Sequence, residues 1–319
     1  MEVTPVFEVF WRYAAERQNI FFKRMRGEPG PWTSNPIFQA FRITNVYRVS
    51  DRASQYLIRS VIYDGKESTR SVEDTFFRIL LFKLFNLPAT WERYAGLGEI
   101  SYRPGILEDI DTNLTNCVNN GIRTCSPAYM MTGSGSKGQP RHRMYLRLLD
   151  QWMADGVPRK MANAKSMEEG FKILRPYRLM GDFLAMQYTL DWNYSPVVDW
   201  SESEFIAAGP GTLRGIQKCF KDVDLKSNPP IEIISYMAEH QDYGFRKFGL
   251  VFQRLGDRPL QMCDISNWFC ETDKISRVLM PELDVKPRRI KNTFEANPKP
   301  IEYFYPPKWK IDRWGFKTE

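Results

Sequence analysis

The sequence predicts a mainly α-helical protein, and three observations support that fold class. Of its 319 residues, 43% are hydrophobic and 14% are aromatic, which is enough to bury a large core. Apolar residues recur at helical spacing, and several of these stretches follow residues that typically cap helices. No alternation of apolar and polar residues is long enough to build a sheet.

Helix signals can be followed along the chain. Thr4 and Pro5 predict a helix that ends before the glycine- and proline-rich loop at 27–36. Ser71 and Asp74 resemble a capping box ahead of a nearly all-apolar segment, which should form a buried central helix. Further helices are expected at 106–121, 143–154, 167–174 and 179–192.

Two changes in composition suggest the domain organisation. Residues 1–285 should form one helical domain, either as a single body or as two lobes that meet near 133–142. Residues 286–319 should form an extended basic C-terminal arm, because they carry nine Lys or Arg against four acids, with prolines and aromatics between them. The arm either packs its aromatics on the helical domain or follows a phosphate backbone.

Charge and cysteine usage narrow the class of protein. The net charge of +7 and the pI near 9.1 suit an anionic partner, with nucleic acid as the leading candidate. The five cysteines show no zinc-type spacing with the two histidines, so we expect reduced thiols in a cytoplasm and no metal site. No signal peptide or membrane-spanning run is recognised, so a membrane function is not expected.

The segment "FRITNVYRVSDRASQYL" at 41–57 is rich in polar side chains. A helix that starts near Asn45 would place three arginines and a glutamine on one face, beside Asp51. These four residues are Arg48, Arg52, Gln55 and Arg59. A solvated, ion-paired face is the alternative. The preceding segment "PWTSNP", with Trp32 and Thr33, adds an aromatic ring and amides, a mixture suited to binding a phosphate and a base.

A second segment, "SESEFIAAGPGTLRGIQKCF" at 201–220, predicts a helix, a tight Gly-Pro-Gly turn and another helix. Ser201 and Glu204 resemble the cap of the first helix. Such an arrangement can present backbone N–H groups to a DNA phosphate, although a single GxG turn is also common elsewhere. The residues expected to hold DNA are Gly209, Gly211, Thr212, Arg214 and Lys218.

A third segment, at 258–278, places Asp264 at the expected start of a helix that also carries Asn267. Asp264 resembles the essential aspartate of helix-hairpin-helix DNA glycosylases, which lies downstream of the hairpin at the start of a helix. The 53 positions between Gly211 and Asp264 exceed the usual spacing in those enzymes, so an insertion is assumed. A simple helix cap is the alternative role of this aspartate.

A family resemblance rests on several stretches taken together. They are "FWRYAAERQ", "PWTSNP", "FRITNVYRVSDRASQY", "LFKLFNLPATW", "AAGPG" and "DISNWFCETDK". They resemble an all-helical, DNA-glycosylase-like family named for α-glutamyl/putrescinyl thymine pyrophosphorylases. That family includes the helical domain of 5-hydroxymethyluracil DNA kinases and the amino acid:DNA transferases of viral thymidine hypermodification. The resemblance covers residues 7–280.

The resemblance implies a pathway that acts on DNA after replication. In it, 5-hydroxymethyluracil is phosphorylated or pyrophosphorylated on its methylene oxygen, and a second enzyme displaces that group with an amino acid or polyamine. Kinase members also carry a phosphate-loop domain. The segment "GSGSKG" at 133–138 lacks the GxxxxGK[ST] frame, so we expect the displacement step.

The same resemblance gives the expected partners and roles. The partners are double-stranded DNA carrying the phosphorylated base, a free amino acid or polyamine, and a separate DNA kinase, in the cytoplasm of a host if the protein is viral. No cofactor is expected. Arg48 and Arg52 would bind the leaving phosphate, and Asp264 or Asp51 would accept a proton or hold an ammonium group. The residues expected to contact a flipped base are Asn45, Asn267, Trp32 and Thr33.

Two other functions stay open at this point. A DNA glycosylase acting on a modified pyrimidine would use Asp264 to promote cleavage of the sugar–base bond. A non-catalytic DNA-binding partner of a 5-hydroxymethyluracil DNA kinase would keep the arginines and the turn but would not depend on that aspartate.

Overall fold

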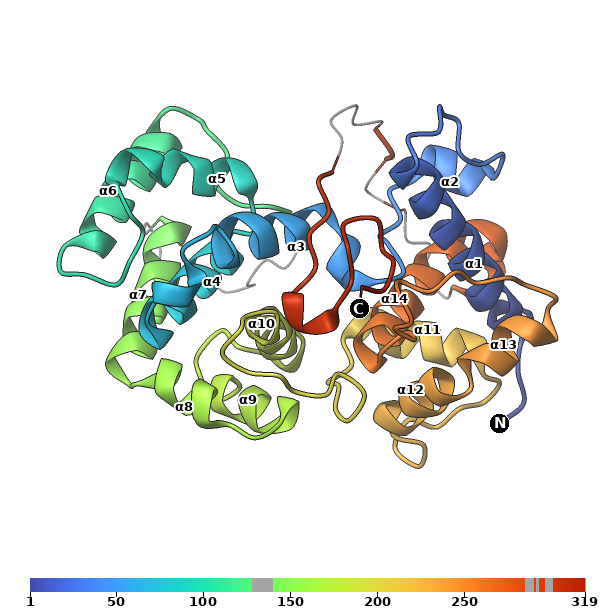
Figure 1. Ribbon diagram of the computed structural model, residues 1–319. Helices are drawn as coiled ribbons and strands as arrows, with labels where there is room; N and C mark the ends of the chain where they lie inside the picture. The colour runs from blue at the N-terminus through green and yellow to red at the C-terminus, as the bar shows by residue number, and fades with distance from the viewer. Residues whose placement is uncertain (128–139, 285–289, 291–292, 296–300, 319) are drawn as a thin grey trace. The chain divides into compact units, whose positions relative to one another are not determined.

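The structure is a computed structural model that describes residues 1–127, 140–284, 290, 293–295 and 301–318. Within these residues the secondary structure is helical, with isolated bridges and no β-strand, which confirms the mainly α prediction (Figure 1). None of the helices described is both long and apolar enough to cross a bilayer. The glycine-rich segment expected to act as a connector lies almost entirely outside the described residues.

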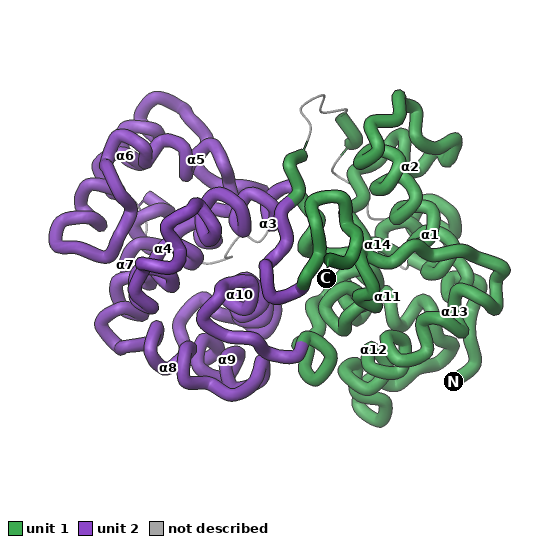
Figure 2. Tube along the Cα trace, in the orientation of Figure 1, with its two compact units in different colours: residues 1–51, 202–303, 310–319 green, residues 52–201, 304–309 purple. Residues whose placement is uncertain are grey.

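The chain forms two compact units (Figure 2). Unit 1 comprises Met1–Asp51, Glu202–Tyr303 and Lys310–Glu319, and unit 2 comprises Arg52–Ser201 and Phe304–Trp309. Each unit therefore combines segments that are distant in sequence. The expected division into a helical domain at 1–285 and a C-terminal arm at 286–319 stays a prediction.

Unit 1 is built around α14, an 18-residue helix with twelve buried residues. Its helices are α1 (Pro5–Met25), α2 (Pro36–Ala40), α11 (Pro210–Cys219), α12 (Pro230–Glu239), α13 (Gln241–Lys247) and α14 (Met262–Leu279), with 3₁₀ turns at Arg48–Ser50 and Pro281–Leu283. The predicted start of α1 is confirmed, because the Thr4 side chain accepts a hydrogen bond from the backbone N–H of Val6 and Pro5 opens the helix. Trp268 of α14 donates to the carbonyl oxygen of Phe10 at 2.8 Å, which ties α1 to α14.

Two glycines set the distance between α11 and α14. A Cβ atom at Gly215 would lie 2.1 Å from the carbonyl oxygen of Phe269, and one at Gly211 would lie 2.4 Å from Sγ of Cys270. Neither position has room for a side chain while the helices keep this spacing. The predicted Gly-Pro-Gly turn therefore lies against α14 rather than on an open surface.

Unit 2 is built around α4, whose residues are buried on nearly every face. Its helices are α3 (Arg52–Tyr56), a π-helix (Leu57–Ile62), α4 (Val72–Phe85), α5 (Pro88–Glu92), α6 (Ile106–Asn119), α7 (Arg141–Ala154), α8 (Val157–Asn163), α9 (Met167–Leu174) and α10 (Asp182–Asn193), with 3₁₀ turns at Glu67–Thr69, Arg93–Leu97 and Pro307–Trp309. Ser71 accepts from the backbone N–H of Asp74 at 3.0 Å, so the predicted cap is confirmed. Helices α7, α8 and α10 surround α4, and Lys83 pairs with Asp191 of α10 at 2.8 Å inside this core (Figure 1).

The expected helix beginning near Asn45 is wrong. Backbone angles are extended at Tyr47 and Asp51, and a single 3₁₀ turn at 48–50 lies between them. The α-helix begins only at Arg52, and the chain then becomes a π-helix at Leu57. The predicted face with three arginines on one helix is therefore not formed.

The first helix of the predicted helix-hairpin-helix is also absent. Residues 201–209 contain turns and irregular backbone, although Gly209 does precede α11 as expected. Glu204, the predicted partner in the cap, is exposed in this segment. The glycosylase-like detail of the fold prediction is therefore not confirmed.

Part of the C-terminal arm packs within unit 2. Lys308 donates to the carbonyl oxygens of Asn193, Ser195 and Val198 near the end of α10, the last at 2.6 Å. The ring centroid of Trp309 lies 5.8 Å from that of Tyr194. At these residues the structure agrees with the alternative in which the arm packs its aromatics on the helical body.

Candidate functional site

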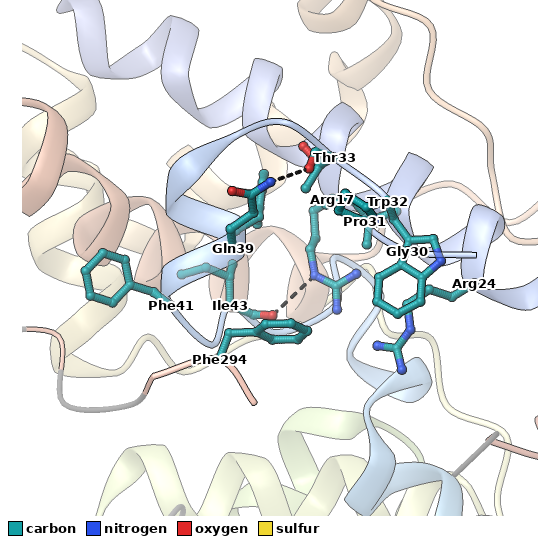
Figure 3. Close-up of a pocket in the computed structure, with 12 residues that line it drawn as sticks. Arg17, Arg24, Gly30, Pro31, Trp32, Thr33, Gln39, Phe41, Ile43 and Phe294 are labelled. Carbon is teal, nitrogen blue, oxygen red and sulfur yellow. Dashed lines mark hydrogen bonds between the residues drawn. The ribbon is translucent and has the colours of Figure 1, made fainter. Parts of the chain in front are cut away.

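A cavity of about 310 Å³ opens in unit 1 beside α1 (Figure 3). Its walls come from α1, the loop at 30–35, α2, the extended chain after α2, and Phe294. The backbone N–H of Phe294 donates to the carbonyl oxygen of Ala40 at 2.9 Å, so this late residue is fixed beside α2. The lining residues are Arg17, Ile20, Arg24, Gly30, Pro31, Trp32, Thr33, Phe38, Gln39, Phe41, Ile43 and Phe294. We call this cavity the α1 pocket.

Side chains of α1 hold the loop that carries Trp32 and Thr33. Glu16 accepts hydrogen bonds from the Thr33 hydroxyl and from Nδ2 of Asn35, the second at 2.9 Å. Lys23 donates to the carbonyl oxygen of Trp32 at 3.2 Å. The two loop residues that the sequence suggested for substrate binding are therefore fixed at the pocket wall.

Two arginines of α1 give the pocket its charge. Nε of Arg17 donates to the carbonyl oxygen of Ile43 at 3.2 Å, while its Nη1 is buried and has no hydrogen-bond partner among the described residues. Burial lowers the pKa of Arg17, and the charge of Asp51 opposes that shift. Arg24 lies 4.8 Å from the ring centroid of Trp32.

The lining contains no acidic residue among the described part of the chain. Aromatic and aliphatic walls with two guanidinium groups suit a flat ring that carries an anionic substituent. The volume lies within the range of about 300 to 1,000 Å³ that is usual for small-molecule sites. The pocket can thus hold an anionic ring, but its own walls supply no carboxylate for proton transfer.

Asp264 lies at the start of α14, as the sequence predicted, but it is not the N-cap. Gln261 is the N-cap, and Asp264 completes a capping box three residues later. Its Oδ1 accepts from the backbone N–H of Arg48 at 2.9 Å, and its Oδ2 accepts from the backbone N–H of Gln261 at 3.0 Å. Burial raises the pKa of Asp264 to about 6, and these hydrogen bonds act in the opposite direction.

A polar network surrounds this aspartate within unit 1. Arg258 pairs with the buried Glu202 at 2.9 Å, and the Tyr47 hydroxyl donates to the carbonyl oxygen of Arg258 at 2.6 Å. Sγ of Cys263 donates to the same Glu202 carboxylate at 3.5 Å. The structure thus brings Arg48 and Asp264 together through the backbone, inside a network that fixes the chain before residue 51.

Asp51 connects this segment to the α1 pocket. Its Oδ1 accepts from the backbone N–H of Asn45 at 2.9 Å, and Nδ2 of Asn45 donates to the carbonyl oxygen of Ser50 at 2.8 Å. Burial raises the pKa of Asp51 to about 6, whereas the positive charge of Arg17 lowers it. Asp51 is therefore a half-buried acid whose charge acts on a pocket arginine.

The residues expected to hold DNA mostly contact α14. Thr212 donates to the carbonyl oxygen of Ser266 at 2.9 Å, and Arg214 pairs with the fully buried Asp273 at 3.0 Å. Lys218 reaches the same carboxylate at 3.1 Å. These contacts show a packing role, and the expected DNA contacts of Gly209, Gly211, Thr212, Arg214 and Lys218 stay predictions.

The remaining predicted residues are dispersed. Arg52 begins α3 in unit 2, whereas Arg48, Trp32 and Thr33 belong to unit 1. Asn267 is partly exposed on α14. No group of described His, Cys, Asp or Glu side chains is arranged to bind a metal ion.

Of the twelve lining residues, the sequence assigned only Trp32 and Thr33 to a site, and four of the others matter most to the argument. They are Arg17, Arg24, Gln39 and Phe294. Arg17 and Arg24 are seven positions apart, so they share a face of α1 with Ile20 between them. Two arginines on one helix face, followed by a loop with a tryptophan, could have indicated a binding site. No residue near Phe294 in the sequence indicated that it lines the same pocket.

The described residues form a mainly helical protein, and the α1 pocket combines aromatic walls with two arginines. The family model described as "5-hmdU DNA kinase, helical domain" matches residues 4–285, so the chain belongs to this family. It is similar to a 5-hmdU DNA kinase of Bacillus phage SP10, with 22% identity over 328 aligned positions that cover 94% of this chain and 50% of the phage protein. The chain thus spans about half the length of that relative. No solved structure matches it significantly.

Proposed function

We propose that this protein is a transferase of thymidine hypermodification in DNA. It displaces phosphate from 5-phosphomethyl-deoxyuridine, or pyrophosphate from the pyrophosphorylated form of that base, and attaches an amino acid or a polyamine in its place. Membership of the 5-hmdU DNA kinase helical family supports the DNA base as substrate. The observation that carries the proposal is the α1 pocket, which combines aromatic walls with the guanidinium groups of Arg17 and Arg24.

In this proposal the target base leaves the DNA stack and enters the pocket. The bond between the methylene carbon and the phosphate oxygen breaks, and its electron pair leaves with the phosphate. The nitrogen of the incoming amine forms the new bond to the methylene carbon and loses a proton. Arg17 and Arg24 bind the leaving group and stabilise its negative charge.

The proton needs an acceptor beyond the pocket walls. Asp51 is proposed for this role, because its carboxylate interacts with Arg17 and its pKa of about 6 leaves it largely ionised at neutral pH. Asp264 uses both carboxylate oxygens for backbone N–H groups, which supports a positioning role instead.

The phosphorylated base must come from a kinase reaction. The phage relative is named a 5-hmdU DNA kinase and is about twice as long as this chain. The 319 residues contain no GxxxxGK[ST] frame. We therefore propose that phosphorylation is performed outside these residues, and that the helical region acts on its product.

Mass spectrometry of nucleosides tests the proposal. DNA that contains 5-phosphomethyluracil is incubated with the protein and a mixture of amino acids and polyamines, then digested. A heavier nucleoside supports the transferase and identifies the incoming group. Unchanged DNA contradicts a self-sufficient transferase, and abasic sites would identify a glycosylase instead.

A non-catalytic recognition module is the second candidate. The observation that favours it is the pocket lining, which has no carboxylate among the described residues. Such a module would bind the modified base and present it to the kinase. In the same assay it would leave the nucleosides unchanged, yet it would raise the rate at which the kinase phosphorylates 5-hydroxymethyluracil in DNA.

A further inference from the structure

We infer that the α1 pocket distinguishes phosphorylated from unphosphorylated 5-hydroxymethyluracil, and that Arg17 is the residue that makes this distinction. The inference deepens the proposed function, on which it rests for the identity of the base. It adds that the pocket itself selects the phosphorylated base, because the unphosphorylated base is held weakly. A reaction that transfers a phosphoryl group to the base must therefore supply the substrate.

The hydrogen bonding of Arg17 is incomplete in a way that a ligand could satisfy. Its Nε is used by the carbonyl oxygen of Ile43, but the buried Nη1 has no partner among the described residues. A buried donor without a partner is costly, and the cost is larger when the group is charged. A phosphate oxygen in the pocket would provide the missing acceptor. Figure 3 shows the guanidinium group of Arg17 among the residues that line the pocket.

The acids near Arg17 do not accept from that donor. Asp51 and Glu271 both interact electrostatically with Arg17. Asp51 accepts from the backbone of Asn45, and Oε1 of Glu271 pairs with Lys274 at 2.5 Å, while Oε2 of Glu271 is buried without a partner among the described residues. Arg24 adds a second positive charge on the same face of α1. The pocket therefore presents a positive charge to its ligand and no negative charge from its own walls.

The ring of the ligand has an apolar place beside these charges. Phe38, Phe41 and Phe294 line the pocket, and Trp32 lies under the Arg24 guanidinium. A pyrimidine can be buried among these rings, which fixes the direction of its 5-substituent. A neutral hydroxymethyl group would leave Nη1 of Arg17 with one weak acceptor at most, whereas a phosphate dianion offers paired oxygens to a planar guanidinium.

Binding measurements with three single-stranded oligonucleotides test the inference. They differ at one central base, which is 5-phosphomethyluracil, 5-hydroxymethyluracil or thymine, and fluorescence anisotropy gives each Kd near physiological ionic strength. We expect the phosphorylated oligonucleotide to bind at least about tenfold more tightly than the other two, because one charge-assisted contact commonly contributes that much. Equal affinities for all three would overturn the inference.

Substitution of Arg17 makes the test specific. Arg17→Gln should reduce the preference to within about twofold and leave the affinity for thymine DNA unchanged, because the general phosphate contacts remain. Arg12→Gln is the matched control, since Arg12 lies exposed on the same helix and pairs with Glu8. A preference that persists in Arg17→Gln would also overturn the inference.

A second variant and a parallel measurement of turnover separate this inference from the proposed function. If Arg17→Gln does not fold, Arg17→Lys provides the second variant, because it keeps the charge but lacks the planar set of donors. The preference should fall in this variant, and an unchanged preference would contradict the inference. Turnover by the wild-type protein is recorded in parallel. A phosphate preference without turnover would contradict the transferase proposal alone, whereas turnover without the preference would contradict this inference alone.

Discussion

The backbone N–H of Arg48 donates a 2.9 Å hydrogen bond to Oδ1 of Asp264, across 216 positions of sequence. The other oxygen of the same carboxylate accepts from Gln261 at the start of α14. One buried aspartate thus caps a helix and fixes the segment that ends at Asp51. Because Asp51 in turn acts on Arg17, the carboxylate at 264 supports the α1 pocket without lining it.

The burial of this carboxyl group predicts a specific dependence of stability on pH. Burial raises the pKa of Asp264 to about 6, compared with about 3.9 for an unfolded aspartate. The folded protein therefore binds more protons than the unfolded chain between these values, so stability is highest below pH 4 and falls as the pH rises through 6. As the pH rises from below 4 to above 6, this group lowers the free energy of unfolding by about 3 kcal/mol in total.

Asp264→Asn removes that titration. Urea denaturation at pH 4.5 and at pH 7 gives the free energy of unfolding of each protein. We expect the decrease from pH 4.5 to pH 7 to be smaller in the variant than in the wild type by about 2 kcal/mol. Asp150→Asn, at an exposed position of α7, is the control and should follow the wild type. An unchanged difference between the two pH values in Asp264→Asn would show that this carboxyl does not titrate as described.

The close approach of α11 and α14 predicts that Gly215→Ala is destabilising. The new Cβ would meet the carbonyl oxygen of Phe269, so the helices must separate, at a cost of about 1–3 kcal/mol. Gly96→Ala is the control, because no atom lies within 4 Å of a Cβ there. Thermal denaturation compares the two, and a Gly215→Ala variant as stable as the control would contradict the packing.

Gly211→Ala separates packing from DNA binding at the Gly-Pro-Gly turn. A Cβ at this position would meet Sγ of Cys270, so we expect lower thermal stability. The affinity of the folded variant for DNA should stay within about twofold of the wild type. Normal stability with a marked loss of DNA affinity would instead support the turn as a phosphate-binding element.

Glu16 is expected to matter for ligand binding more than for folding. It accepts from Thr33 and Asn35 of the pocket loop through its two oxygens, and Glu16→Gln replaces one of these oxygens with an NH2 group, which cannot accept a hydrogen bond. The affinity for phosphorylated DNA should fall by about tenfold, or roughly 1.4 kcal/mol, with little change in Tm. Glu8→Gln on the same helix is the control, and equal affinities in both variants would argue against the loop as a pocket wall.

The C-terminal arm offers a test by hydrogen exchange. Lys308→Met removes a cation that donates to three carbonyl oxygens near the end of α10, so amides at 304–309 should exchange faster. Lys310→Met, at an exposed position, should leave these amides protected. Equal exchange in both variants would show that the Lys308 contacts do not hold the segment.

Local signals predicted the helices well, because their caps are encoded within a few residues. Thr4 and Ser71 each cap the helix that the sequence assigned to them. The segment at 45–51 was misread because its backbone is shaped by distant partners, chiefly Asp264, which outweigh the helical pattern. The same holds at 201–209, where Glu202 is drawn into the unit 1 core by Arg258.

The candidate site was predicted only in part. Trp32 and Thr33 were recognised because an aromatic residue and amides stand out in a short loop. Arg17 was not assigned a role, although it lies within one of the family stretches, because a charge on an amphipathic helix normally faces solvent. Its importance depends on its buried Nη1 and on Phe294, and neither can be derived from spacing along the chain.

The most direct test of the account is the stoichiometry of the proposed reaction. DNA with 5-phosphomethyluracil is incubated with the protein and the amine identified by mass spectrometry, and released phosphate and new nucleoside are measured together over time. The account predicts one phosphate for each new nucleoside in the wild type and in Arg12→Gln, with both products lost in Arg17→Gln. Phosphate release without a new nucleoside, or equal yields in Arg17→Gln, would contradict it.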